Sequence, residues 1–548
     1  MIFNAKKSFI SAIVCLTLSL SVSAQLFPVS IIHLNDFHAR FEEVNSNSGT
    51  CKPDEGEICI GGYGRVVTMV KRLLEEKRDL NPIYLNAGDN FQGTLWYNIH
   101  RWNVTSYFLN LLPADVMTLG NHEFDHQVAG VVPFLESIKS PIVVANVDAS
   151  EEPTFDGKFS KTFVIEKYSR KIGVIGVMLQ TTPNIASTGK LKFTDEATAV
   201  REEAAKLKSE GIDIIIVLSH SGLEVDVAIA TNGGPDIDVI VGGHSHTFLW
   251  TGANKPGPDT PRGDYPTIVQ QSQHGNRRVL IVQASAYTKY LGDITVWFDD
   301  AGELVEYEGA PIYLGPEIVP DPAIQAELVP WKTVVDAAGL RVVGHSKIEI
   351  TKFGCSDGEC NSGNLITDAY VHSYVSQMPK PAKGWIHAAI SATNTGGIRS
   401  LPSTPGPLNY GDLVAIIPFE NTLDSLELRG DHILEMLEFS ASSTLTWLQV
   451  SGMRIVFNMT RPIGSRVISV DLLCNECDIP VYEPIEVDRM YRFIMPSFLA
   501  GGGDGFYMVS DNKQNHVVGG IDIDAFEEYV AKMSPLMNPV NGRITVVT

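Results

Sequence analysis

The sequence predicts an α/β protein of two domains joined by a helix. Short β-rich runs alternate with helical patterns in both halves of the 548-residue chain, and a helix-like stretch, Asp321–Gly339, separates the halves. Hydrophobic residues make up 44% and charged residues 19% of the chain, which is enough apolar material for sizeable cores. The predicted division is a signal peptide at 1–24, a first domain at 25–318, a linker helix at 319–341 and a second domain at 342–548.

The first domain is predicted to alternate buried strands with amphipathic helices. Helical periodicity falls on Gly64–Arg78 and Thr194–Gly211. A loop dense in glycine and proline is expected at 250–265. The predicted strands are Val29–Leu34, Pro82–Asn86, Val116–Leu119, Ile142–Ala145, Ile172–Val177, Ile212–Leu218 and Ile237–Val241.

The two ends of the chain predict export from the cell. Lys6 and Lys7 precede an apolar stretch, and Val22–Ala24 fits a small-residue cleavage site, so residues 1–24 are expected to be a secretory signal peptide. A membrane anchor is the alternative, but the apolar run is short for a span. No apolar tail follows a small-residue site at the C-terminus, so no lipid anchor is expected. We therefore expect a secreted protein without a membrane anchor.

Cleavage of the predicted signal peptide would remove Cys15 and leave six cysteines. In an oxidising compartment their close spacing predicts three local disulfides, Cys51–Cys59, Cys355–Cys360 and Cys474–Cys477. A zinc site at Cys474 and Cys477 is the weaker alternative, because no second pair stands at zinc-finger spacing. Glycosylation sequons at Asn103 and Asn458 agree with export.

Acidic residues outnumber basic ones by 64 to 42, for a formal net charge of −22 at pH 7. This balance argues against nucleic-acid binding, which needs a basic surface. An anionic substrate would need a locally positive site to overcome the overall charge.

Side chains that ligate metals follow five of the predicted strands. The candidates are Asp36, His38, Asp89, Asn121, His220, His244 and His246. Because open α/β sheets bind ligands beyond the carboxyl ends of their strands, these loops can bring the candidates together. Oxygen and nitrogen ligands without a thiolate suit zinc, manganese or a similar divalent ion, and seven are enough for two ions that share a carboxylate. Two such ions are a recurring solution for displacement at phosphorus.

His122 and Asp125 stand three positions apart, beside Asn121. If the segment turns helically, both face the same side, and the carboxylate can orient the histidine. Such a histidine could stabilise the transition state or protonate the leaving oxygen. The alternatives are that His122 is a further metal ligand or is structural.

Four motifs follow the predicted strands: Asn35-Asp36-x-His38, Gly88-Asp89-Asn90, Gly120-Asn-His-Glu-Phe-Asp125 and Gly242-Gly-His-Ser-His246. They resemble the signature of the calcineurin-like metallophosphoesterases, and more narrowly of the 5′-nucleotidase/apyrase family. In the second half, Asn394-Thr-Gly-Gly-Ile-Arg399, Pro418-Phe419 and Phe498-Leu-Ala-Gly-Gly-Gly-Asp504-Gly-Phe506 resemble that family's nucleotide-binding domain. The resemblance runs from about residue 28 to the end and implies an N-terminal metallophosphoesterase α/β sandwich and a C-terminal α/β nucleotide-binding domain.

The resemblance also implies roles for individual residues. Asp89 would bridge two metal ions, and His122 held by Asp125 would be the catalytic dyad. The first ion would be held by Asp36, His38, Asp89 and His246, and the second by Asp89, Asn121, His220 and His244. Phe419 and Phe498 would sandwich the base. Arg399 would contact phosphate, Asp504 would accept hydrogen bonds from the ribose hydroxyls, and Asn394 would line the same pocket. Core packing is the alternative role of the two phenylalanines.

Two positions depart from the family's pattern. His246 stands where many relatives carry Asn or Gln, which gives the first metal site a stronger nitrogen ligand. Ser356, between Cys355 and Cys360, stands where relatives commonly carry a phosphate-binding arginine. A charge-assisted hydrogen bond of that kind is typically worth ~1.5–3 kcal/mol, so the preference among mono-, di- and triphosphates depends on this position.

With a signal peptide and no lipid anchor, the sequence looks most like the secreted salivary apyrases of blood-feeding arthropods. The resemblance implies hydrolysis of ATP and ADP to AMP and phosphate, which suppresses ADP-driven platelet aggregation. A 5′-nucleotidase that releases phosphate from AMP is the alternative. Zinc is the expected metal, with manganese, calcium and magnesium as alternatives, and the second domain is expected to rotate to deliver phosphate to the metals.

Arg262-Gly263-Asp264 is the minimal tripeptide that integrins recognise, and it falls in the 250–265 loop. Such a tripeptide occurs by chance in roughly one chain in ten of this length, so a solvated loop is the simpler interpretation. The functional alternative is an antagonist that blocks fibrinogen binding to a platelet integrin, alone or alongside catalysis.

Overall fold

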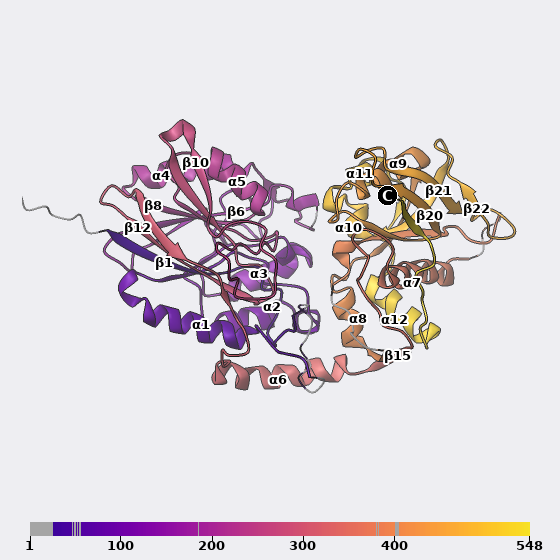
Figure 1. Ribbon diagram of the computed structural model, residues 1–548, viewed down its shortest axis with the longest axis horizontal. Helices are drawn as coiled ribbons and strands as arrows, with labels where there is room; N and C mark the ends of the chain where they lie inside the picture. The colour runs from indigo at the N-terminus through magenta and orange to yellow at the C-terminus, as the bar shows by residue number, and fades with distance from the viewer. Residues whose placement is uncertain are drawn as a thin grey trace, which may run out of the picture.

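The computed structural model describes residues 26–547 apart from positions 47, 49, 50, 52, 54, 55, 185, 380, 382 and 400–404. The predicted signal peptide at 1–24 lies outside the described residues. Two α/β halves stand side by side, with α6 (Pro322–Gly339) running along one edge of both, as Figure 1 shows. The predicted α/β class and two-part architecture are thereby confirmed. Within the described ranges, no helix is long and apolar enough to cross a bilayer.

Two six-stranded sheets form the N-terminal half. One has the order β13-β12-β1-β2-β3 with β14 beside β12, and the other has the order β10-β11-β9-β8-β6-β5. The first contains β1 (Phe27–Leu34), β2 (Ile83–Asn86), β3 (Val116–Met117), β12 (Tyr290–Phe298), β13 (Leu304–Gly309) and β14 (Ile312–Tyr313). The second contains β5 (Thr162–Ile165), β6 (Ile172–Met178), β8 (Ile214–His220), β9 (Val239–Val241), β10 (Thr267–Gln271) and β11 (Arg277–Val282). A short pair, β4 (Val147–Asp148) and β7 (Lys192–Phe193), stands apart.

The two sheets pack face to face as a sandwich, because successive side chains along each strand point alternately to the core between the sheets and to the helices outside. In β8, Ile214 and Ile216 join a core that also holds side chains from β1, β2 and β12, whereas Ile215 and Val217 pack with the helices of the opposite face. The helices are α1 (Tyr63–Glu76), α2 (Leu95–Leu109) and α3 (Gln127–Ser137) outside the first sheet, and α4 (Glu196–Ser209) and α5 (Leu223–Asn232) outside the second. The N-terminal half is therefore built as helices, sheet, sheet and helices.

One predicted strand is wrong. Ile142–Ala145 is buried but belongs to no strand, and it makes only isolated bridges, from Ile142 to Met117 and from Val143 to Ser160. The physical reason is that its backbone N–H groups bond to three different segments, so no continuous ladder forms. The other predicted strands and both predicted helices are present within a few residues of their expected bounds.

A five-stranded sheet forms the centre of the C-terminal half, with the order β19-β16-β23-β18-β24. In β23, Phe493 and Met495 face a core shared with a four-stranded sheet, whereas Ile494 faces α7, α8 and α12. The central strands are β16 (Ile390–Asn394), β18 (Leu423–Arg429), β19 (Leu448–Ser451), β23 (Met490–Pro496) and β24 (Gln514–Val517). The four-stranded sheet contains β20 (Met453–Asn458), β21 (Val467–Leu473), β22 (Tyr482–Pro484) and β25 (Ile544–Val547). A two-stranded sheet pairs β15 (Val342–Ser346) with β17 (Gly406–Asn409).

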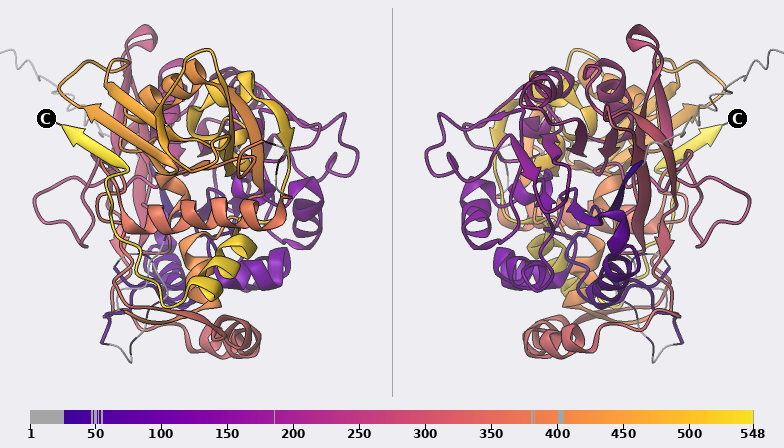
Figure 2. Two further views of the ribbon diagram at one scale, coloured as in Figure 1. Left: turned by 90° about the vertical axis from the view of Figure 1, so that its right-hand side faces the viewer. Right: turned by 90° about the vertical axis from the view of Figure 1, so that its left-hand side faces the viewer.

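The described residues of the C-terminal half form six α-helices, with α7 and α12 packed against each other on one side of the central sheet (Figure 2). They are α7 (Asn361–Gln377), α8 (Tyr410–Ile416), α9 (Gly430–Ser440), α10 (Ser497–Ala500), α11 (Tyr507–Asn512) and α12 (Asp522–Met533). The connecting helix α6 begins at Pro322, where Asp321 caps it by accepting bonds from two backbone N–H groups. It contacts α1 and α2 in one half and α8 in the other. All three predicted disulfides are formed.

Candidate metal centre

Parallel strands bring the predicted ligands to one edge of the N-terminal sandwich. β1, β2 and β3 run parallel in one sheet, and β6, β8 and β9 run parallel in the other. His220 is the last residue of β8, and the other six candidates stand in loops that follow β1, β2, β3 and β9. The carboxyl ends of these strands therefore gather residues that lie as much as 210 positions apart, Asp36 to His246.

The first ligand cluster joins Asp36, His38, Asp89 and His246, whose ligand atoms all lie within 4.8 Å of one another. His246 Nε2 is 3.2 Å from Asp36 Oδ1 and 3.1 Å from His38 Nε2. Two imidazole nitrogens and two carboxylates that converge in this way can enclose one divalent cation.

The second cluster joins Asp89, His220 and His244, and Asn121 lies beside it. Asn121 Oδ1 is 2.8 Å from His244 Nδ1. His220 Nδ1 is 2.6 Å from the Ala87 carbonyl, which fixes a proton on Nδ1 and directs Nε2 at the centre. That buried Nε2 has no hydrogen-bond partner, although Asp89 Oδ2 lies 3.1 Å away. A buried ring nitrogen without a hydrogen-bond partner, facing a carboxylate, offers two ligand atoms that a divalent cation can join.

The charge states of three of these groups, His38, His244 and Asp89, suit metal binding. Burial lowers the pKa of His38 well below its ordinary value, and burial with nearby His220 lowers the pKa of His244 to about 4, so both rings are neutral near pH 7. Burial alone would raise the pKa of Asp89, but His220, His122 and His38 hold it well below the usual range. At His220 burial lowers the pKa, but Asp89 and Asp36 raise it to about 10, so this ring is protonated near pH 7 and must release its Nε2 proton to bind a metal. Neutral His38 and His244 beside an ionised Asp89 are already in the protonation states that a metal needs.

Most of the predicted ligands have an unusual backbone conformation. Five of the seven have positive φ angles, namely Asp36 (50°), His38 (49°), Asp89 (53°), His244 (72°) and His246 (50°). Such a conformation costs a residue with a Cβ about 1–3 kcal/mol, so the surrounding structure must impose it. The sequence carries no signal for this strain.

Glu123 is a buried residue that supports the loop after β2 and to which the sequence assigned no role. Its carboxylate accepts backbone N–H bonds from Asp89 at 3.1 Å, Asn90 at 2.7 Å and Gly120 at 2.7 Å. These bonds tie the loop after β2 to the loop after β3 and fix the bridging candidate Asp89. Its position inside the Gly120–Asp125 motif was the signal that could have identified it.

His122 and Asp125 come together as their spacing predicts. His122 Nδ1 lies 2.7 Å from Asp125 Oδ2, and the His122 backbone N–H donates to Asp89 Oδ1 at 2.9 Å. Burial opposes protonation of His122, but Asp125 and Asp89 raise its pKa to about 9. The ring centroid is 5.1 Å from that of His38, which places a protonated imidazole beside the first ligand cluster.

The C-terminal half reaches this centre through aromatic and cationic side chains. The Phe419 ring stacks on His122 with centroids 5.3 Å apart and 16° between the planes, and the Arg399 guanidinium lies 4.7 Å from the Phe419 centroid. Arg399 Nη1 donates to the Tyr287 hydroxyl at 2.9 Å, and the Tyr287 ring is 5.0 Å from that of His246. The predicted phosphate contact therefore lies beside the first ligand cluster, positioned by a tyrosine that the sequence did not single out.

The other predicted substrate residues lie deeper in the C-terminal half. Asn394 Nδ2 donates to Asp504 Oδ2 at 2.7 Å. Phe498 packs over Gly503, where a Cβ would come within 2.6 Å of the ring, so a larger residue there would displace the Phe498 ring. Phe419 stacks on His122, so a base cannot use that ring face in this arrangement of the two halves.

An ionic contact joins the two halves near the dyad. Arg101 Nη1 lies 2.7 Å from Glu420 Oε2, and His126 Nε2 lies 3.4 Å from the same oxygen. Arg101 and Glu420 both have positive φ angles, 56° and 53°, and Arg101 interrupts α2. Glu420 follows Phe419 and His126 follows Asp125, so the contact ties the predicted base site to the predicted dyad.

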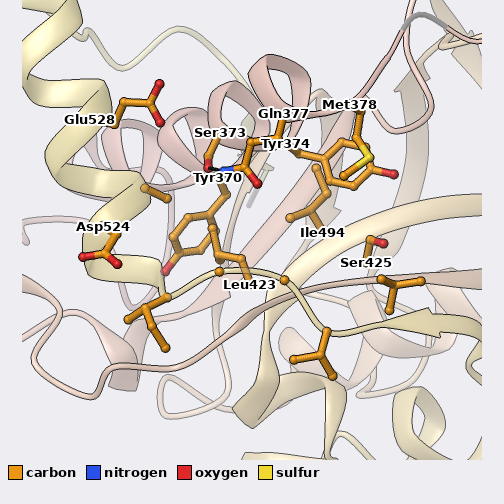
Figure 3. A pocket seen from close by; sticks show the side chains of 16 residues that line it. Tyr370, Ser373, Tyr374, Gln377, Met378, Leu423, Ser425, Ile494, Asp524 and Glu528 are labelled. Atoms are coloured by element: carbon orange, nitrogen blue, oxygen red, sulfur yellow. Dashed lines mark hydrogen bonds between the residues drawn. The ribbon is translucent and has the colours of Figure 1, made fainter.

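Several predicted features lie away from this centre. Arg262 and Asp264 are exposed in the 250–265 loop, which is irregular as expected. Of the sequon asparagines, Asn103 is exposed on α2 and Asn458 is half-buried at the end of β20. A cavity of about 250 Å³ between α7 and α12, drawn in Figure 3, is lined by residues such as Tyr370 and Asp524 and by none of the predicted site residues.

Comparison with known proteins agrees with this geometry. Residues 29–248 match the calcineurin-like phosphoesterase family and residues 342–511 match the 5′-nucleotidase C-terminal domain. The chain is 47% identical to an apyrase of Tabanus yao over 95% of this chain and 94% of that relative. It is 37% identical to the 5′-nucleotidase of Rattus norvegicus over 96% and 93% of the two chains. The crystal structure of a 5′-nucleotidase precursor from Thermus thermophilus aligns with a TM-score of 0.81 and 33% identity, covering 95% of this chain and 99% of that one.

Proposed function

Because the chain belongs to the 5′-nucleotidase family of calcineurin-like phosphoesterases and is a metal-dependent nucleotide phosphohydrolase, we propose that it is an apyrase that hydrolyses ATP and ADP to AMP and phosphate. The observation that carries the proposal is the pair of ligand clusters that share Asp89. The name apyrase, which relatives from Tabanus yao and Aedes aegypti carry, supports di- and triphosphates as the substrates of this chain. A 5′-nucleotidase acting on AMP is the alternative, favoured by the relative of that name.

The residues present fit two divalent ions. Asp36, His38, Asp89 and His246 would hold one ion, and Asp89, Asn121, His220 and His244 would hold the other. When bound, the ions supply a deprotonated water and neutralise charge on the phosphoryl oxygens. Zinc suits the histidine-rich set, with manganese, calcium and magnesium as alternatives.

His122 is placed to handle the proton of the leaving group. Asp125 holds the Nδ1 proton of the ring, so Nε2 is the atom that faces substrate. With a pKa raised to about 9, the imidazole carries a proton on Nε2 at neutral pH. In ADP hydrolysis, water adds to the terminal phosphorus, the bond to the bridging oxygen breaks, and that oxygen takes the proton from His122.

The C-terminal half would bind the nucleotide. Arg399 would contact phosphate, Asn394 and Asp504 would line the ribose site, and Phe419 with Phe498 would stack on the base. Since His122 stacks on Phe419 in the described arrangement, base binding on that face requires the halves to move relative to each other. This supports a rotation of the C-terminal half during turnover.

The direct test is phosphate release from AMP, ADP, ATP and UDP-glucose, each with and without a chelator. An apyrase releases phosphate from ADP and ATP, releases little from AMP, and loses activity when the metal is removed. AMP as the best substrate would instead establish the 5′-nucleotidase alternative. Activity that survives complete metal removal would overturn both.

We further propose that the protein is secreted and that removal of ADP suppresses platelet aggregation. Expression of the full chain with its first 24 residues, followed by N-terminal sequencing of material from the medium, tests export; intact chain retained in the cells would refute it. Added to ADP-stimulated platelets, the wild type should suppress aggregation and an inactive Asp89→Asn variant should not.

A second candidate function is integrin binding through Arg262–Asp264, and the exposure of both charged side chains favours it. The names of the relatives give it no support. Asp264→Glu should abolish binding to a platelet integrin and leave phosphate release unchanged. Equal integrin binding by the variant and the wild type would eliminate this candidate.

A further inference from the structure

Lys352 and Arg399 lie next to each other at the base of the predicted phosphate site. Lys352 Nζ donates to the carbonyl oxygen of Ile398, the residue before Arg399, at 2.6 Å. Among the ion pairs of the described residues, none joins either cationic group to a carboxylate, and Asp504 is near enough to Arg399 only for the arginine to counter the rise that burial causes in its pKa. Burial, and secondarily the neighbouring charge of Arg399, lower the pKa of Lys352 to about 8.

Two neighbouring cations that form no ion pair with a carboxylate are unfavourable unless an anion joins them. Donors are available for that anion on both side chains. Arg399 Nε is buried and has no hydrogen-bond partner. The Lys352 ammonium group has three donors, of which one bond, to Ile398, is found within the described residues. The pair is therefore arranged to receive an acceptor-rich group such as a phosphate.

Arg399 stands between Lys352 and the metal ligands. Its guanidinium bonds to Tyr287, whose ring contacts those of His246 and His38. The charge of Arg399 lowers the pKa of His38 as well as that of Lys352, so Arg399 is close to both. A single phosphate held by the ligand clusters can therefore reach Arg399, but an anion that also reaches Lys352 must extend further.

We propose that Lys352 binds a non-scissile phosphate of a nucleoside di- or triphosphate, next to Arg399. The inference rests on the proposed nucleotide hydrolase and deepens it, because it assigns the residue that separates ADP and ATP from AMP. Lys352 is held close to the Cys355–Cys360 loop, since the Cys355 N–H donates to the Lys352 carbonyl oxygen at 3.0 Å. It thus supplies a cation three positions before Cys355, in a loop where Ser356 provides none.

The test compares Lys352→Gln and Lys352→Arg with the wild type, using ADP, ATP and AMP as substrates. Loss of a charge-assisted bond should raise KM for ADP and ATP by about tenfold to a hundredfold in Lys352→Gln. KM for AMP should change by less than about twofold, and kcat should stay close to that of the wild type. Lys352→Arg should keep the wild-type preference. Lys532→Gln, on an exposed lysine of α12, is the matched control and should change nothing.

A second variant makes the assignment specific to charge at this site. Adding Ser356→Arg to Lys352→Gln should restore most of the lost affinity for ADP. If Lys352→Gln is poorly folded, Lys352→Met, of similar length, gives the same comparison. Unchanged KM values, or equal increases for AMP and ADP, would overturn the inference while leaving the hydrolase intact. Absence of ADP hydrolysis by the wild type would instead reject the proposed function.

Discussion

The metal centre and the nucleotide-facing surface are built in different ways. Ligands of the metal centre follow strand ends, most of them are buried, and the loop that carries Asp89 is fixed by backbone N–H groups that donate to the Glu123 carboxylate. The nucleotide-facing surface consists of long or aromatic side chains of the C-terminal half. Arg399 and Phe419 reach across to the N-terminal half, and Lys352 lies next to them, bonded to the carbonyl of Ile398. The first is fixed within one sandwich, whereas the second depends on how two halves meet. Changes in the first should therefore abolish catalysis for every substrate, and changes in the second should alter affinity and preference.

The largest effect should come from Asp89→Asn. Asp89 is shared by both ligand clusters, so its loss should weaken both metal sites and lower phosphate release by at least about a thousandfold for ATP, ADP and AMP alike. Phosphate release and bound metal should be measured on the same samples. Asp213→Asn, a partly exposed control residue paired with Lys208, should behave as wild type. Selective loss for one nucleotide would contradict a shared centre.

His122→Gln should act on the chemical step alone. Loss of the leaving-group proton should lower kcat about a hundredfold or more, with bound metal unchanged. Steady-state kinetics with metal analysis check this outcome. A loss of metal equal to that in Asp89→Asn would instead make His122 a ligand, which was the alternative role.

The contribution of Lys352 to ADP binding should depend on pH, with an effect of intermediate size. The ammonium group must be protonated to bind phosphate, and its pKa in the free protein is about 8. Below that pH the KM of the wild type for ADP should be lower than that of Lys352→Gln by about tenfold or more. As pH rises through about 8, this difference should shrink. The ratio of the two KM values, followed from about pH 6.5 to pH 9.5, isolates this group from substrate ionisation. A ratio independent of pH would contradict the assignment.

The smallest effect should come from Glu420→Gln, which breaks the contact with Arg101. Partly exposed ion pairs are worth about 0–1 kcal/mol, so kcat and KM should each change by less than about fivefold. Equal changes for AMP and ADP would fit a contact that sets how the halves meet. A loss as large as that of His122→Gln would show that the contact belongs to the catalytic machinery.

The same contrast explains what the sequence could and could not predict. Ligands at strand ends were predictable because a buried strand followed by Asp, Asn or His is visible in a short window. The contacts of Arg399 with Tyr287 and of Arg101 with Glu420 were not, because they join residues 112 and 319 positions apart. The positive φ angles of the ligands were equally hidden, since they are imposed by surrounding bonds. The strand predicted at Ile142–Ala145 was wrong because the segment has the composition of a strand, but its backbone hydrogen-bond partners lie in three different segments.

The central claim is that two metal ions, held at one edge of the N-terminal sandwich, drive hydrolysis of nucleoside di- and triphosphates. The most direct measurement adds a divalent ion stepwise to chelator-treated protein and records bound metal and ADP hydrolysis together. We predict that activity returns as bound metal approaches two ions per chain, and that Asp89→Asn recovers neither. Full ADP hydrolysis without bound metal, or at one ion per chain, would contradict the account.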